Sequence, residues 1–109
     1  MDVVTDFQLS AADLKAALER KEPLVLLDVR EPWEFEYCKI PGSRLIPLGE
    51  LHSRHEELDP EKTFVLICHH GVRSMHALHM LRHFGFENLK NLRGGVDAYS
   101  DVDATVPRY

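Results

Sequence analysis

One of the two cysteines carries the strongest chemical signal in this sequence of 109 residues. Cys68 ends the apolar run 64–68, and His69-His70-Gly71-Val72-Arg73 follow it directly. Loop amides that turn inward around Gly71 would form a nest for an anion, and Arg73 would add a permanent positive charge. Cysteine, glycine and arginine at this spacing predict a reactive thiolate, so Cys68 is the candidate nucleophile.

The segments on either side of Cys68 are suited to presenting a nucleophile. Residues 64–68 have no polar alternation, which is typical of a strand covered on both faces. Residues 74–84 have a helical pattern that ends at Gly85, and the amino end of this helix would stabilise a thiolate in the loop. The alternative is that Cys68 is only a small buried hydrophobe, but the neighbouring glycine and arginine favour the reactive thiolate.

Apolar runs and helical patterns alternate along the rest of the chain. Ser10 is the predicted N-cap of the first helix. We expect helices over residues 11–19, 31–37, 49–58, 74–84 and 96–99, and strands over residues 24–28, 43–48, 64–68 and 88–92. Alternation of strands and helices predicts an α/β fold with a mostly parallel sheet and helices on both faces. Ligands of such sheets bind beyond the carboxyl ends of the strands, where Cys68 lies.

Composition limits the class of protein. With 44% hydrophobic and 28% charged residues, the chain is expected to form a single domain over residues 1–109, with a core over about 6–100 and a short polar C-terminal tail. A net charge of −5 argues against nucleic acid as a partner. The apolar runs are too short to span a membrane. With only two cysteines and no apolar leader segment, we expect reduced thiols and a cytoplasmic protein.

Charge is unevenly distributed along this acidic chain. Residues 68–93 contain four arginines and lysines against one acidic residue, together with five of the seven histidines. A short basic segment in an acidic protein indicates a small anionic ligand rather than a polyanion.

Three segments of the chain together resemble the single-domain rhodanese-like family of sulfurtransferases. Residues 27–35 with 40–43 look like the first family signature, residues 67–74 like the active-site loop, and residues 91–99 like the closing signature. The match spans about residues 7–99. It implies the family fold, a five-stranded parallel sheet flanked by helices, with no cofactor and no metal.

The resemblance also implies a chemical role for the loop. Cys68 would accept sulfane sulfur as a persulfide and pass it to a nucleophile. The expected substrate-binding residues are His69, His70, Gly71, Val72 and Arg73, whose amides would cradle the persulfide while Arg73 attracts an anionic donor. The expected partners are thiosulfate or a persulfide donor, a thiol or cyanide acceptor, and a protein donor or acceptor. Two loop histidines replace the more basic residues of efficient thiosulfate users, which favours other donors.

Other functions compete with this interpretation. The chain could be a sulfur-relay or binding module that only a protein partner loads. A small cysteine-dependent phosphatase or arsenate reductase is a weaker alternative, since the phosphatase loops resemble this one but have one residue more between cysteine and arginine. A non-catalytic interaction domain is disfavoured because Cys68 and Arg73 are both present.

Smaller features have ordinary explanations. His76, His79 and His83 fall on one helix face, which we interpret as a solvated face rather than a metal site. Cys38 is expected to be a bystander rather than a resolving thiol. Arg30 and Glu34 are four residues apart and are expected to form an ion pair.

Overall fold

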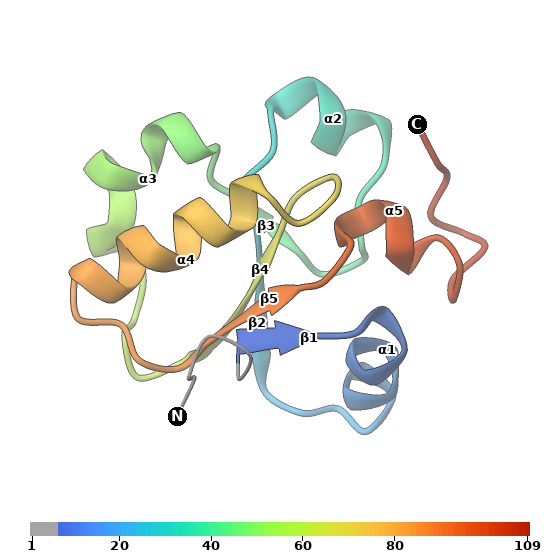
Figure 1. Ribbon diagram of the computed structural model, residues 1–109, viewed down its shortest axis with the longest axis horizontal. Coiled ribbons are helices and arrows are strands. Elements are labelled where there is room, and N and C mark those ends of the chain that lie inside the picture. The colour runs from blue at the N-terminus through green and yellow to red at the C-terminus, as the bar shows by residue number, and fades with distance from the viewer. Residues whose placement is uncertain (1–6) are drawn as a thin grey trace.

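Five short segments lie side by side as parallel strands in the computed structural model, which describes residues 7–109 (Figure 1). The strand order is β1-β5-β4-β2-β3, and each neighbouring pair is parallel. The strands are β1 (Gln8–Leu9), β2 (Leu24–Asp28), β3 (Arg44–Leu45), β4 (Thr63–Ile67) and β5 (Leu89–Leu92). The expected five-stranded parallel sheet is therefore confirmed. Residues 1–6, which the expected domain includes, lie outside the described residues.

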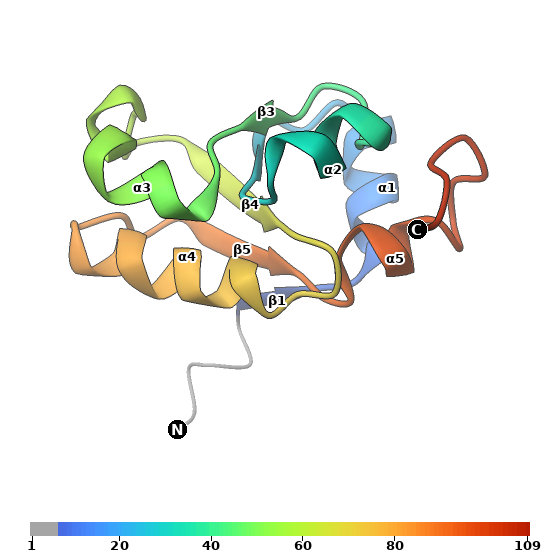
Figure 2. The same ribbon diagram turned by 90° about the horizontal axis from the view of Figure 1, so that it is seen from above.

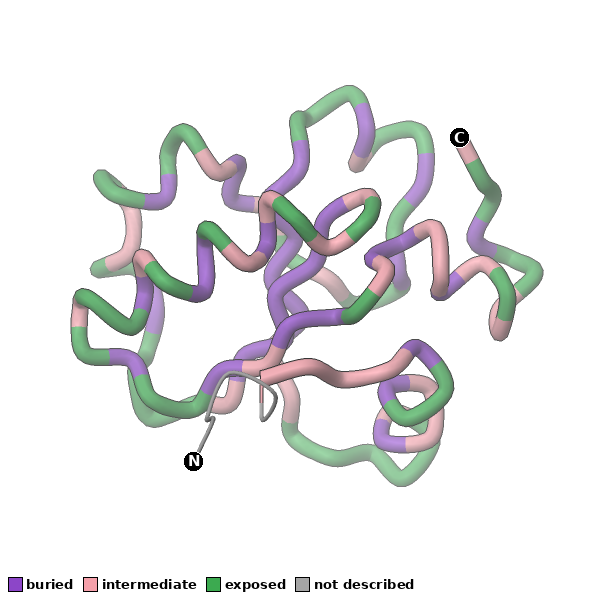
Figure 3. The backbone as a smooth tube through the Cα atoms, viewed as in Figure 1, coloured by how far each residue is buried: buried purple, intermediate pink, exposed green. Residues whose placement is uncertain are grey.

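The two central strands position the candidate nucleophile. β2 and β4 pair over their whole length, from Leu24 opposite Thr63 to Asp28 opposite Ile67. Both are mostly buried (Figure 3), which explains why their sequences are apolar without alternation. Because Cys68 follows Ile67 directly, it lies at the carboxyl edge of the sheet.

Within residues 7–109, four helices connect the strands and a fifth follows β5, as the sequence pattern predicts. They are α1 (Ala11–Glu19), α2 (Pro32–Tyr37), α3 (Leu48–Arg54), α4 (Arg73–His83) and α5 (Gly95–Tyr99), with a short 3-10 helix (His55–Glu57) after α3. The Ser10 side chain caps α1 by accepting a hydrogen bond of 3.1 Å from the amide of Asp13. None of the helices among residues 7–109 has the length and apolar character needed to cross a membrane.

Some boundaries differ from the sequence prediction. The strand expected over residues 43–48 is only two residues long, because β3 is an edge strand that pairs with β2 alone. The helix expected over 49–58 begins at Leu48 and ends in the 3-10 turn. Cys68 itself lies just beyond β4 rather than within it, so its main chain belongs to the loop.

Helices cover both faces of the sheet and form two apolar cores. On one face, Leu27 and Leu66 pack with residues from α3 and α4, including Leu51 and Leu78. On the other face, residues such as Leu26 and Val65 pack with side chains of α1 and α5. Adjacent residues of a strand thus enter different cores, as strand geometry requires. Figure 1 shows α4 and α1 on opposite sides of the strands, and in Figures 1 and 2 the loop after β4 lies between α4 and α5.

The C-terminal segment differs from the short polar tail that composition predicts. Val106 is 2% exposed and belongs to the core that α1 and α5 share. Tyr109 returns to the carboxyl edge of the sheet, where its ring stacks on His69 with centroids 3.9 Å apart. The packed part of the domain therefore extends beyond residue 100, because this segment covers apolar surface that α5 leaves open.

Candidate active site

The Cys68 loop turns back on itself so that its own backbone faces the sulfur. Gly71 has φ +100°, a conformation that side chains other than hydrogen disfavour, and its amide donates a 3.0 Å hydrogen bond to Cys68 Sγ. A Cβ atom at this position would lie 3.2 Å from the amide nitrogen of Gly94. Gly71 therefore supplies the inward-turned amide that the sequence predicts.

A buried polar chain holds the loop from beneath. Ser74 Oγ lies 3.3 Å from Cys68 Sγ and donates a short hydrogen bond to Asn91 Oδ1 on β5. Asn91 Nδ2 in turn donates to Gln8 Oε1 at 3.0 Å and, more weakly, to Gly71 O at 3.4 Å. Since Ser74 and Asn91 are buried, these bonds fix the start of α4 against the neighbouring strand.

The two loop histidines form one wall of the site together with Tyr109. The His69 ring stacks between His70, at 3.9 Å, and Tyr109, also at 3.9 Å. Burial and the neighbouring His70 lower the pKa of His69, which favours its neutral form. Its Nε2 atom is buried and has no hydrogen-bond partner in the part of the chain that the structure describes. Val72, by contrast, is 66% exposed on the outside of the loop.

Arg73 contacts a carboxylate from a different part of the chain. Its two terminal nitrogens donate to the two oxygens of Glu34 at 2.7 and 2.9 Å, a bidentate pair that joins α4 to α2. The ion pair expected between Arg30 and Glu34 is therefore wrong. Arg30 instead binds Asp28, at the end of β2, through a fully buried bidentate pair.

Tyr109 connects these two ion pairs. Its hydroxyl donates to Glu34 Oε2 at 2.8 Å and accepts from Arg30 Nη1 at 2.9 Å. The hydrogen bond from Arg73 dominates the titration of Glu34, whose pKa falls to about 2 despite burial. Burial raises the pKa of Tyr109 to about 12, so the hydroxyl keeps its proton as a donor. Charge at the mouth of the site is thereby balanced and fixed in position.

The second cysteine lies on the other side of the sheet. Cys38 belongs to the core shared by α1 and α5, whereas Cys68 belongs to the core shared by α3 and α4. Both are free thiols. Packing into a different core from Cys68 fits the bystander role expected for Cys38.

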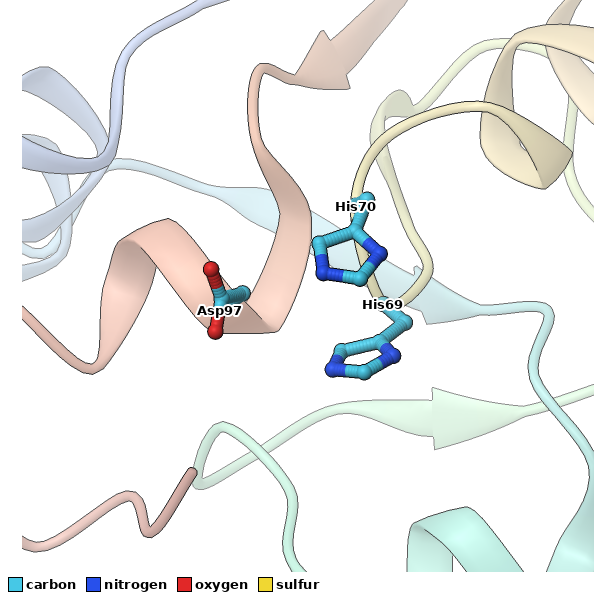
Figure 4. Close-up of side chains that lie close together, drawn as sticks. All are labelled: His69, His70 and Asp97. Carbon is cyan, nitrogen blue, oxygen red and sulfur yellow. The ribbon is translucent and has the colours of Figure 1, made fainter. Parts of the chain in front are cut away.

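Histidines and carboxylates converge at one place in the described residues. His69, His70 and Asp97 each offer a ligand atom within 4.8 Å of the other two (Figure 4). The histidines of α4, namely His76, His79 and His83, are exposed and do not belong to any such group among residues 7–109. The exposure of these three histidines agrees with the solvated face expected on that helix.

Sequence reasoning missed several residues that shape the site. Glu34 binds Arg73 and is itself bound by Tyr109, and Ser74 and Asn91 hold the Cys68 loop. A glutamate in the first turn of a short helix and an asparagine in β5 are visible in the sequence, but their burial is known only from the structure. Tyr109 had no such signal, because nothing local indicates that the tail folds back.

Comparisons with known proteins agree with this geometry. The family model described as "Rhodanese-like domain" matches residues 10–101. "Putative sulfurtransferase YtwF" of Bacillus subtilis is 38% identical over 92 residues, covering 84% of this chain and 88% of that protein. "Putative sulfur carrier protein YrkF" of the same organism is 37% identical over 89 residues, covering 82% and 48%. Curated relatives vary in length, and the chain spans between 22% and 88% of the length of those compared.

A solved structure shares the fold. The rhodanese-related protein of Thermoplasma volcanium superimposes with a TM-score of 0.81 at 32% identity, covering 92% of this chain and 96% of that one. The family model covers all of the sheet except β1, and it includes the whole Cys68 loop. The chain belongs to the rhodanese-like domain family.

Proposed function

We propose that this protein transfers sulfane sulfur through a persulfide on Cys68. The observation that carries the proposal is the amide of Gly71, which donates to Cys68 Sγ at 3.0 Å from a backbone that only glycine adopts easily. A hydrogen bond from a fixed amide stabilises a thiolate, and it remains available to the persulfide that replaces it. The named sulfurtransferase and sulfur carrier relatives support the same chemistry.

The reaction would proceed in two displacements. The Cys68 thiolate attacks the outer sulfur of thiosulfate, the S–S bond of the donor breaks, and sulfite leaves with the bonding electron pair. The outer sulfur of the resulting persulfide is then attacked by cyanide or a thiolate, which restores the Cys68 thiolate. In both steps negative charge moves between sulfur atoms at Cys68. Hydrogen-bond donors around this residue therefore lower the activation free energy of both steps.

In this proposal Arg73 attracts an anionic donor less strongly than an arginine without a carboxylate partner would. Two of its donors are bound to Glu34, which neutralises much of its charge. Its side chain is nevertheless 35% exposed, and its remaining N–H groups are available to an anionic donor. We therefore propose that Arg73 assists thiosulfate without being essential for a neutral persulfide donor.

A second candidate, a sulfur relay loaded by a protein persulfide, is favoured by the rim of the site. The large hydrophobic side chains exposed within residues 7–109 are Trp33, Tyr37 and Val72. Val72 is in the Cys68 loop, and the rings of Trp33 and Tyr37 contact Tyr109, which itself stacks on His69. Exposed aromatic and aliphatic groups gathered around a reactive group are typical of protein interfaces.

Mass spectrometry of the reduced protein tests both candidates. Incubation with thiosulfate or a protein persulfide should add the mass of one sulfur atom, and cyanide or a thiol should remove it. Cys68→Ser should gain no sulfur, while the matched variant Cys38→Ser should still load. Sulfur uptake by Cys68→Ser would refute the mechanism. Loading from the protein persulfide with none from thiosulfate would select the relay over the small-molecule enzyme.

A further inference from the structure

The histidines that follow Cys68 meet an aspartate from another element. His69 and His70 come from the Cys68 loop and Asp97 from the first turn of α5, and one ligand atom of each lies within 4.8 Å of the others. Figure 4 shows both imidazole rings presenting a nitrogen toward the Asp97 carboxylate. Two imidazoles and a carboxylate are the ligand set of a borderline transition-metal ion, with a fourth position left for water.

A second observation points to a ligand at the same place. Nε2 of His69 is buried and has no hydrogen-bond partner among residues 7–109, although buried polar atoms are almost always satisfied. Tyr109 and His70 cover the two faces of the His69 ring, so the partner of this nitrogen must approach in the plane of the ring. A metal ion binds an imidazole nitrogen in that plane.

The backbone and the neighbouring charges support the cluster. The amides of Val96 and Asp97 donate to the carbonyls of Cys68 and His69 at 2.9 and 3.1 Å, which holds α5 against the loop. Arg108 Nε donates to Oδ1 of Asp97 at 3.0 Å and orients the carboxylate. The charge of Arg108 is shared with Asp101, which it binds at 2.6 Å.

We propose that His69, His70 and Asp97 bind one divalent transition-metal ion of the zinc class. The two rings, now inclined by 26° to each other, would tilt further apart so that their nitrogens converge on the ion. Oδ2 of Asp97 is the third ligand, since Arg108 holds Oδ1. A bound ion would tie the Cys68 loop to α5 through side chains as well as through the backbone. The site is independent of whether Cys68 carries sulfur.

Calorimetric titration with Zn²⁺ tests the proposal, with Mg²⁺ as a hard-cation control. The reduced chain of 109 residues should bind one Zn²⁺ and no Mg²⁺. His70→Ala and Asp97→Asn should each weaken Zn²⁺ binding by at least about tenfold, because even loss of an outer-shell partner costs about 10–100-fold. His70 is exposed and Asp97→Asn is isosteric, so both variants should fold.

Two further variants exclude other zinc ligands. Cys68→Ser removes the thiol that competes for zinc, and it should keep the affinity within about threefold of the wild-type value. His79→Ala removes an equally exposed histidine of α4 and should also keep it. The proposal stands only if the first pair of variants loses zinc and this pair retains it. Loss in Cys68→Ser, loss in His79→Ala, or no binding by the wild-type chain would each overturn it.

Because Cys68→Ser cannot form a persulfide, zinc binding by this variant is measured apart from sulfur transfer. A failure of the proposed function would therefore leave the zinc result intact, and the reverse also holds.

Discussion

Cys68 and Cys38 have similar burial but very different surroundings. They are 1% and 6% exposed, and both are free thiols. Cys68 Sγ accepts a hydrogen bond of 3.0 Å from the Gly71 amide, whereas Cys38 Sγ has only a long contact of 3.9 Å with Arg30 Nη1. Burial alone therefore does not distinguish a candidate nucleophile from a structural cysteine. The difference lies in the loop that turns its backbone donors toward the sulfur.

An arginine bound to a carboxylate accompanies each cysteine. Arg30 and Asp28 beside Cys38 are both 0% exposed, and Arg30 Nη2 also donates to the Cys38 carbonyl at 2.6 Å. Arg73 near Cys68 is 35% exposed, although its partner Glu34 is only 5% exposed. The fully buried pair of Arg30 and Asp28 stabilises the structure, whereas the partly exposed Arg73 is also accessible to a substrate.

The largest effect is expected from replacing Gly71 in the Cys68 loop by alanine, and Gly42, which follows Cys38 in the sequence, is the matched control. Gly71 and Gly42 have φ +100° and +86°, so alanine at either position costs about 1–2 kcal/mol of backbone strain. Only Gly71→Ala also meets neighbouring backbone, since nothing lies within 4 Å of a Cβ at Gly42. Misplacing the amide that binds Cys68 Sγ should slow persulfide loading about a hundredfold to a thousandfold.

Time-resolved mass spectrometry of the two glycine variants checks this expectation. Gly42→Ala should lose stability but load sulfur within about threefold of the wild-type rate. Equal loading by both variants would mean that the Gly71 amide has no part in the chemistry, and the contrast between the two cysteines would fail.

Glu34 should make the free energy of unfolding of the domain depend on pH in the acid range. Its pKa is about 2 in the folded chain against an ordinary value of 4.5, so its charged form stabilises the fold by roughly 3 kcal/mol. Because the folded pKa is the lower one, this contribution is complete above pH 4.5 and disappears as the pH falls toward 2. Glu34→Gln should therefore be much less stable than the wild-type protein at pH 7 and nearly equal to it near pH 2.

Urea unfolding at several pH values measures the effect of Glu34. Glu36→Gln, an exposed position on the same helix, is the matched control and should change stability little at any pH. A constant difference between Glu34→Gln and wild type across the acid range would contradict the role of the ionised carboxylate.

Replacement of Arg73 should affect anionic and uncharged sulfur donors to different extents. Losing one charge-assisted contact costs on the order of 1.5 to 3 kcal/mol, so Arg73→Ala should lower kcat/KM for thiosulfate about tenfold to a hundredfold. An uncharged persulfide donor should suffer less, and Arg73→Lys should recover part of the loss because a point charge cannot reproduce the planar guanidinium. Equal impairment with both donors would mean that Arg73 acts only by holding Glu34 and the loop.

Removal of the hydroxyl that joins the two arginine pairs should have the smallest effect. Tyr109→Phe keeps the ring on His69 but loses the hydrogen bonds to Glu34 and Arg30. Because water can replace the hydroxyl at this partly exposed position, we expect a loss of about 1 kcal/mol in urea unfolding and less than a threefold change in loading. Tyr109→Ala, which also removes the ring, should be clearly less stable than Tyr109→Phe. Equal stability of the two would show that the stacked ring contributes nothing.

Much of the fold could be predicted because its signals are local. The bounds of α1 and β2 agree with the pattern of the sequence, since a capping serine and an unbroken apolar run lie within a few residues of the features they specify. The same is true of the Cys68 loop, because Cys68, Gly71 and Arg73 lie within one short segment, residues 68–73. Short elements such as β3 were less predictable, because their length depends on how far a neighbouring strand extends.

The sequence by itself determined the alternation of strands and helices, the position of Cys68 at the carboxyl edge of the sheet, and the glycine that turns an amide toward it. Only the tertiary structure decided which residues face that loop. Glu34 meets Arg73 across 39 positions, and Tyr109 meets Glu34 across 75. Such partners follow from the strand order and from the path of the C-terminal segment, which bring side chains together by packing and not by spacing along the chain.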